Sequence, residues 1–185
     1  MSADQDITDQ DSKKISIVGT NTRFQLKKVT QNKQIKVRTI SNTWKDIPDI
    51  DNQVKMIETL HQENNDCGNN EYSCVVTEIN NKINGYKHQD ILKGLYKSEL
   101  FVSYNQVINQ LNDCKLTCYY CSSKVMVLYS IVREPLQWSL DRINNDDGHT
   151  NENVVISCLK CNLERKRRTK DAFVFTKKMV ITRIT

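Results

Sequence analysis

Apolar residues along this chain follow two different periods, and each period predicts a different kind of element. Over residues 15–40 they alternate with polar ones, as in the run that starts at Ile35, which predicts short β-strands. Over residues 53–61 they recur every three or four positions, which predicts an amphipathic helix. Residues 1–14 have neither period and are acidic, so we expect a disordered tail there. The polar run that follows residue 61 predicts a loop and a domain boundary, which leaves 15–66 as a small β-rich region.

Residues 75–115 are predicted to form a helical region of short segments. The first helix is expected over residues 75–83 and a second after a break at Gly85. Ser103 is expected to cap a third helix that begins at Tyr104, because a serine side chain satisfies the free N–H groups of a first helical turn. A small bundle is the simplest arrangement of these segments, and a helix-turn-helix pair is the alternative.

The last third of the chain alternates between strand and helix patterns. Residues 124–132 are apolar and β-branched, which predicts a strand ended by Pro135. Two further strands are expected at 138–143 and 154–157, followed by a helix over 158–170. These elements form a predicted domain over residues 116–172, followed by a β-like segment over 173–185, so the expected fold class is α+β.

Four of the seven cysteines occur in two Cys-x-x-Cys pairs, formed by Cys118 with Cys121 and by Cys158 with Cys161. Each such turn presents two sulfur atoms to one centre, so the four thiolates predict a tetrahedral structural zinc site. Cys67 and Cys74 are too widely spaced for a second metal site to be favoured, and Cys114 is read as a plain thiol.

Composition and charge limit the compartment and the class of partner that we expect for the protein. The 185 residues are 38% hydrophobic and 26% charged, with a formal net charge of +5, and no stretch approaches the length of a membrane span. The polar N-terminus is unlike a signal peptide, and thiols in metal-type pairs suit a reducing compartment. We therefore expect an intracellular protein without a membrane partner. The basic runs at 21–40 and 160–185 favour a polyanion such as nucleic acid.

Residues 118–170 resemble the zinc-clasped subset of the HNH, or ββα-metal, endonuclease superfamily that is found in phages and large DNA viruses. The resemblance lies in the order of three motifs: Leu-Asp-Arg-Ile from Leu140, Asn-Val-Val from Asn153, and Cys-x-x-Cys-Asn ending at Asn162. It implies a viral protein with a zinc-stabilised ββα-metal core, acting at a viral replication site. The run Arg-Lys-Arg-Arg from Arg165 separately resembles a nuclear import signal, which makes the nucleus the other expected location. The implied activity is metal-dependent cleavage or nicking of DNA.

Family roles carry over to three residues of this chain, and the role of the general base does not. Asp141 and Asn162 match positions that bind a catalytic Mg²⁺ or Mn²⁺, and Asn153 matches the residue that steadies the loop between the strands. The position of the usual histidine base holds Arg142, whose guanidinium cannot accept a proton near neutral pH but can clamp a phosphate. His149, in the loop, is the candidate replacement base.

A run of basic side chains follows the second cysteine pair on the expected helix. Its members are expected to grip phosphates of a bound nucleic acid: Arg165, Lys166, Arg167 and Arg168. Because Arg142 replaces the base, the function stays open between an HNH-type endonuclease and a catalytically inactive HNH-like zinc module that binds nucleic acid without cutting it. A third reading makes the cysteines a scaffold for protein contacts in a viral assembly, and the basic run after Cys161 argues against it.

Overall fold

The computed structural model describes residues 19, 20, 22, 26, 35–39, 46–62 and 72–179. The chain divides into two compact units, Met1–Ile35 and Lys36–Thr185, and the fold described below is that of the second. The acidic tail predicted at 1–14 and half of the predicted β-rich region lie outside the described residues, as does Cys67.

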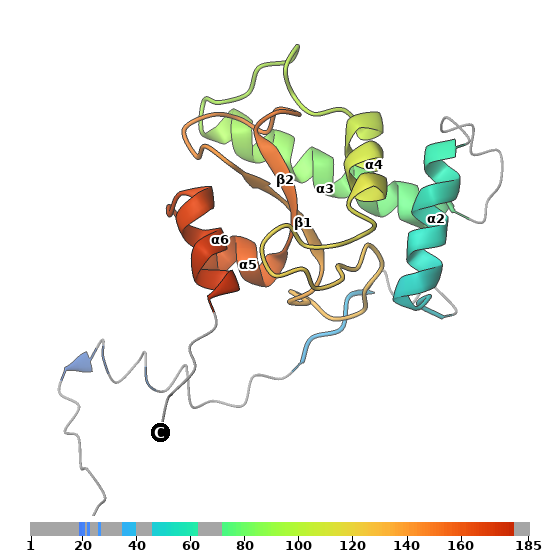
Figure 1. Ribbon diagram of the computed structural model, residues 1–185, viewed down its shortest axis with the longest axis horizontal. Coiled ribbons are helices and arrows are strands. Elements are labelled where there is room, and N and C mark those ends of the chain that lie inside the picture. The colour runs from blue at the N-terminus through green and yellow to red at the C-terminus, as the bar shows by residue number, and fades with distance from the viewer. Residues whose placement is uncertain are drawn as a thin grey trace, which may run out of the picture. The chain divides into compact units, whose positions relative to one another are not determined.

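Helices and one small sheet make up the described part of the second unit, which confirms the predicted α+β class. Within that part the elements are α2 (Ile50–Gln62), α3 (Ser73–Leu92), α4 (Tyr104–Asp113), β1 (Trp138–Arg142), β2 (Val154–Cys158), α5 (Leu159–Arg165) and α6 (Lys170–Lys178) (Figure 1). None of the helices in these described ranges combines the length and the apolar character that a membrane crossing needs.

The sheet is an antiparallel pair of strands, β1 and β2, in a register that sets Trp138 opposite Cys158 and Arg142 opposite Val154. These strands confirm the predictions at 138–143 and 154–157, since buried Trp138, Leu140 and Ile156 anchor them in the core. Helix α5 follows β2 without a loop and contacts both strands.

Two-stranded sheets are marginal alone, and both free edges of this one are covered. On the β1 edge, α3 supplies the partners: the Leu140 amide donates to the Tyr86 hydroxyl at 3.0 Å, and the Lys82 ammonium donates to the Trp138 carbonyl. On the β2 edge, the amide of Tyr119 donates to the Ile156 carbonyl at 2.9 Å. Helix α3 and the first cysteine turn therefore flank the two strands.

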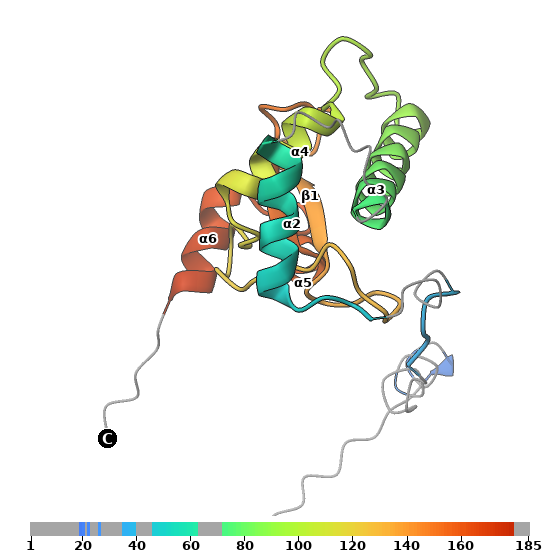
Figure 2. The ribbon, with the colours of Figure 1, turned by 90° about the vertical axis from the view of Figure 1, so that its right-hand side faces the viewer.

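Helix α4 connects the sheet to α2 and α3, because it contacts both helices and β2. Figure 2 shows α4 beside α2. Ser103 begins this helix as predicted. Its side chain accepts the Gln106 amide, while the Gln106 side chain accepts the Ser103 amide, which forms a reciprocal capping box. Buried Val107, Ile108 and Leu111 form the inner face of the helix.

The strand predicted at 124–132 is wrong. The segment makes only isolated bridges, such as that of Met126 with Gln137, although Val125, Val127 and Leu128 are buried. The Gln53 side chain on α2 replaces a neighbouring strand, because its Oε1 accepts the amides of residues 127 and 128 at 2.8 and 2.9 Å. A buried apolar run has the same pattern whether its backbone bonds to a strand or to a side chain.

Three other predicted boundaries also change. Gly85 does not interrupt α3, which continues to Leu92, and the chain turns instead near Gly94, whose φ is +67°. The helix expected over 158–170 ends at Arg165, because Lys166 has a φ of +54°. Thr169 then caps α6 by accepting the Ala172 amide, so the expected β-like segment is helical up to Lys178.

Candidate functional site

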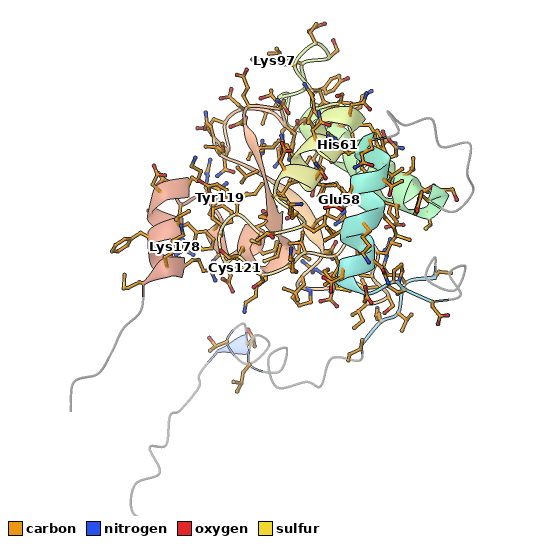
Figure 3. All side chains as sticks on the ribbon, turned by 45° about the vertical axis from the view of Figure 1, so that its right-hand side comes forward. Glu58, His61, Lys97, Tyr119, Cys121 and Lys178 are labelled. Atoms are coloured by element: carbon orange, nitrogen blue, oxygen red, sulfur yellow. The ribbon has the colours of Figure 1, made fainter. Side chains whose placement is uncertain are left out.

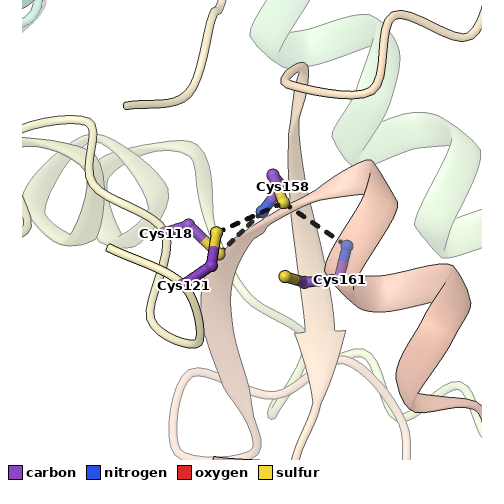
Figure 4. Close-up of side chains that lie close together, drawn as sticks. All are labelled: Cys118, Cys121, Cys158 and Cys161. Carbon is purple, nitrogen blue, oxygen red and sulfur yellow. Dashed lines mark hydrogen bonds between the residues drawn. The ribbon is translucent and has the colours of Figure 1, made fainter. Parts of the chain in front are cut away.

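The four cysteines of the two pairs converge on one point (Figure 4). Their sulfur atoms all lie within 4.8 Å of one another, and those of Cys121 and Cys158 are 3.9 Å apart. Zinc–sulfur bonds of ~2.3 Å in a tetrahedron place sulfur atoms ~3.8 Å apart, so this cluster could hold a structural metal such as zinc. The clustering agrees with the spacing of the pairs in the sequence.

Three segments supply these sulfurs, and their backbone supports the cluster. The amide of Cys158, at the end of β2, donates to the sulfur of Cys118 at 3.2 Å, and the amide of Cys161 in α5 donates to that of Cys158 at 3.4 Å. Burial raises the pKa of Cys161 to about 12. A thiolate is therefore unfavourable at Cys161, whereas the hydrogen bond with Cys158 lowers the pKa of Cys118 to about 4. A cation at the centre of the cluster would supply charge that stabilises all four thiolates.

A polar cavity of about 150 Å³ lies between β1 and the C-terminal part of α3. Four of the residues singled out from the sequence line it: Asp141, Arg142, His149 and Asn162. Its other lining residues are Tyr86, Gln89, Lys93, Leu140 and Asn145. The cavity thus gathers an imidazole, two cationic side chains and several amides in one small space.

Asp141 is 4% exposed, and its carboxylate already has strong partners. Arg165 binds both oxygens, with Nε 2.5 Å from Oδ2 and one terminal nitrogen 3.0 Å from Oδ1. The Tyr120 hydroxyl also donates to Oδ2 at 2.5 Å. A bidentate guanidinium neutralises the carboxylate, so a divalent cation beside it would meet a like charge.

The expected Mg²⁺ or Mn²⁺ site at Asp141 and Asn162 therefore does not fit the donor set. The side-chain nitrogen of Asn162 donates to the Ser139 hydroxyl at 3.2 Å and to the Leu140 carbonyl at 3.3 Å, leaving one neutral amide oxygen. Hard divalent cations prefer several charged or carbonyl oxygens. We assign no chemical step to such an ion.

His149 is buried and held from α3. Its Nδ1 lies 2.8 Å from Oδ1 of Asp90, and its backbone amide donates to Oδ2 of the same carboxylate at 2.6 Å. Desolvation by burial lowers the pKa of His149 below its ordinary value, although the charge of Asp90 acts in the opposite direction. The ring is therefore neutral at pH 7, as a proton acceptor must be.

Arg142 and Asn153 take different positions around the loop between the strands. Arg142 donates to the Asp147 carbonyl at 2.8 Å and lies 4.0 Å from the Asp90 carboxylate, while still lining the cavity. The Asn153 side chain donates to the carbonyls of Asn144 and Gly148 and accepts the Asn144 amide. Its geometry is that of a residue that steadies the loop.

The basic run after the cysteines divides into buried and exposed members. Arg165 is 1% exposed and bound to Asp141, so its expected contact with nucleic acid is wrong. Lys166, Arg167 and Arg168 are exposed in the turn between α5 and α6. Within the described part of the chain, Arg167 makes one distant ion pair, 3.9 Å from the exposed Asp146, which contributes little to stability.

Sequence reasoning missed the residues that hold the site from a distance. Asp90 gave no signal, because it lies in an ordinary helical segment 59 positions before His149. Tyr120 lies between two cysteines, where its bond to Asp141 could not be read from spacing. His61, at the end of α2 (Figure 3), lies outside this site, and its Nδ1 is 3.0 Å from the side-chain oxygen of Asn109 on α4.

Comparisons with known proteins give no family for this chain, so any functional assignment rests on the geometry of the site. No protein-family model, curated protein or solved structure gives a significant match to the chain.

We predict that Cys158→Ser will remove most of the zinc from the purified protein. The wild-type chain should hold about one zinc ion, and the loss of one of four sulfur ligands weakens a closed tetrahedral site. Metal content after dialysis against a mild chelator tests this, with Cys74→Ser as the control for a thiol outside the cluster. Equal zinc in the two variants would contradict the assignment.

Arg165→Met should destabilise the zinc-loaded protein by about 3–5 kcal/mol, because it leaves the Asp141 carboxylate buried without its charged partner. Chemical denaturation at pH 7 measures the change. Arg167→Met, which removes an exposed guanidinium from the same turn, should change the free energy of unfolding by less than about 0.5 kcal/mol. Similar losses of stability in both variants would show that Arg165 contributes no more to folding than an exposed arginine of the same run.

Proposed function

We propose that this chain binds nucleic acid and hydrolyses a phosphodiester bond at the polar cavity, with His149 as the general base. One observation carries the proposal: the cavity brings a buried neutral imidazole beside the cationic side chains of Arg142 and Lys93. A guanidinium and an ammonium bind phosphate oxygens, and an imidazole accepts a proton from water. A proton acceptor and phosphate-binding cations are two of the components that phosphodiester hydrolysis uses.

The reaction follows from the roles of these groups. His149 takes a proton from a water molecule as the water oxygen forms a bond to phosphorus. The bond from phosphorus to the leaving oxygen breaks, and that oxygen takes a proton from solvent. Arg142 and Lys93 offset the negative charge that grows on the phosphate oxygens. A positioned general base contributes roughly 10²–10⁴-fold to the rate of such a step.

The order of elements supports an HNH-type arrangement of this site. Strand β1, the loop held by Asn153, strand β2 and helix α5 follow one another, and the cysteine cluster lies at the junction of β2 with α5. Structural zinc would then hold the module, while the chemistry belongs to side chains of the cavity. The exposed cations between α5 and α6 offer additional phosphate contacts.

A second candidate is nucleic-acid binding without cleavage. The pairing of Asp141 with Arg165 favours it, because that pair uses the carboxylate that an HNH-type enzyme would offer to a metal ion. Arg142, at the position of the usual base, cannot accept a proton. In this case the cavity would hold a backbone phosphate and leave it intact.

Plasmid nicking by the zinc-loaded protein distinguishes the two functions. We expect wild-type protein to nick supercoiled plasmid, and His149→Ala to lower the rate by about 10²-fold or more while leaving DNA affinity unchanged. His88→Ala removes an exposed histidine from α3 and should leave the rate unchanged.

The nicking rate of the wild-type protein should rise with pH through a midpoint below the ordinary pKa of histidine, because the pKa of His149 is lowered. Binding without nicking would favour the second candidate.

Both candidates predict salt-dependent DNA binding that involves the α5–α6 turn. Replacing Lys166 and Arg167 together with alanine should reduce the dependence of log affinity on log salt concentration by about 1–2 units, since each lost phosphate contact releases about one counterion fewer. Lys55→Ala is the control, because it removes one exposed positive charge from α2, away from this turn. Fluorescence anisotropy at several salt concentrations measures the slope. An unchanged slope would exclude this turn from the interface.

A further inference from the structure

We infer that Asp90 on α3 is the positioning residue for His149, so that a helix outside the cysteine-framed segment completes the site. This inference rests on the proposed function, because it gives Asp90 a task in the same reaction. No motif of the sequence singles out Asp90, and it lies well before the segment that begins at Cys118.

The contacts of Asp90 fix both the backbone and the ring of the base. Oδ2 accepts the backbone amide of His149 at 2.6 Å, and Oδ1 lies 2.8 Å from Nδ1 of its ring. Asp90 is fully buried, so water does not compete for these bonds. The Tyr86 ring, with its centroid 4.7 Å from that of the imidazole, limits rotation of the ring from a second direction.

These contacts select which ring nitrogen can act as the base. A carboxylate accepts hydrogen bonds, so a neutral imidazole bonded to it must carry its proton on Nδ1. Nε2 is then left as the acceptor, and His149 lines the cavity in which a water molecule and a phosphate would lie. Without the carboxylate, the two neutral tautomers would compete, and the one protonated on Nε2 cannot accept a proton there.

Gly148 allows this close approach of the loop to α3. A Cβ atom at this position would lie 2.6 Å from the Leu95 carbonyl oxygen and 3.0 Å from Oδ2 of Asp90. The first contact is with backbone, which cannot rotate away. The residue before His149 must therefore be glycine for the amide and the ring of His149 to reach the same carboxylate.

The charges around His149 decide how its titration responds to Asp90. The groups that face it are Asp90 and Tyr86 on α3, Lys93 just after α3, and Asp141 and Arg142 on β1. Among them, Asp90 raises the pKa of His149, while Arg142 and Lys93 lower it. Removing the negative charge of Asp90 should therefore lower the pKa of His149 further.

The first test is made on the wild-type protein. NMR of ¹⁵N-labelled, zinc-loaded full-length chain at pH 7 reports which imidazole nitrogen of each histidine carries the proton, and variants of the other two histidines assign the His149 signals. We expect His149 to be protonated on Nδ1 and not on Nε2. Protonation on Nε2, or an average of the two tautomers, would overturn the inference. This readout does not depend on whether the protein cuts DNA.

The second test is Asp90→Asn, with Glu152→Gln as a matched control at an exposed position in the loop. Asp90→Asn should lower kcat for nicking on the order of 10²-fold or more with little change in KM, and should shift the pH midpoint of the rate to lower values. Glu152→Gln should change neither quantity. Zinc content and far-UV circular dichroism verify that both variants fold.

The outcomes separate this inference from the proposed function. A wild-type chain that never nicks DNA but carries the Nδ1 proton on His149 would refute the reaction and retain the pairing. A wild-type chain that nicks DNA, with an Asp90→Asn variant of unchanged kcat and pH midpoint, would refute the role of Asp90 and retain the reaction. If Asp90→Asn does not fold, the tautomer of the wild-type ring decides.

Discussion

A carboxylate buried near the end of β1 requires a positive partner, and two neighbouring segments of this module supply its partners. Asp141 receives Arg165 from α5 and the Tyr120 hydroxyl from the first cysteine turn. The same two segments contribute Cys118, Cys121 and Cys161 to the four-sulfur cluster. A metal ion that joins the sulfurs would therefore also bring Arg165 and Tyr120 to Asp141. Loss of either feature should weaken the other.

The smallness of the sheet explains why α3 belongs to the site. A two-stranded sheet leaves the outer edge of each strand without hydrogen-bond partners, and the side chains of Tyr86 and Lys82 cover that edge of β1. Once α3 lies against β1, its next turn brings Asp90 within reach of the loop that follows β1. The same packing that completes the sheet thus supplies the partner of His149.

How much of the site the sequence could predict depends on how local its signals are. The cysteine cluster and both strands were predictable, because spacing and period lie within a few residues of each element. The pairing of Arg165 with Asp141 spans 24 positions, and that of Asp90 with His149 spans 59, so neither leaves a local pattern. Arg165 looked like a phosphate ligand only because a basic run does not reveal which member turns inward.

The balance of charge around the cavity decides which ligand it suits. Asp141 is neutralised by Arg165, and Asp90 faces the neutral ring of His149 with Arg142 at 4.0 Å. Lys93 then has no acidic counterpart among the residues that line the cavity. A cavity with a surplus of positive charge attracts a phosphate and repels a free divalent cation. Electrostatics therefore favours the proposed site, in which protein side chains would hold a backbone phosphate and the imidazole of His149 would accept the proton.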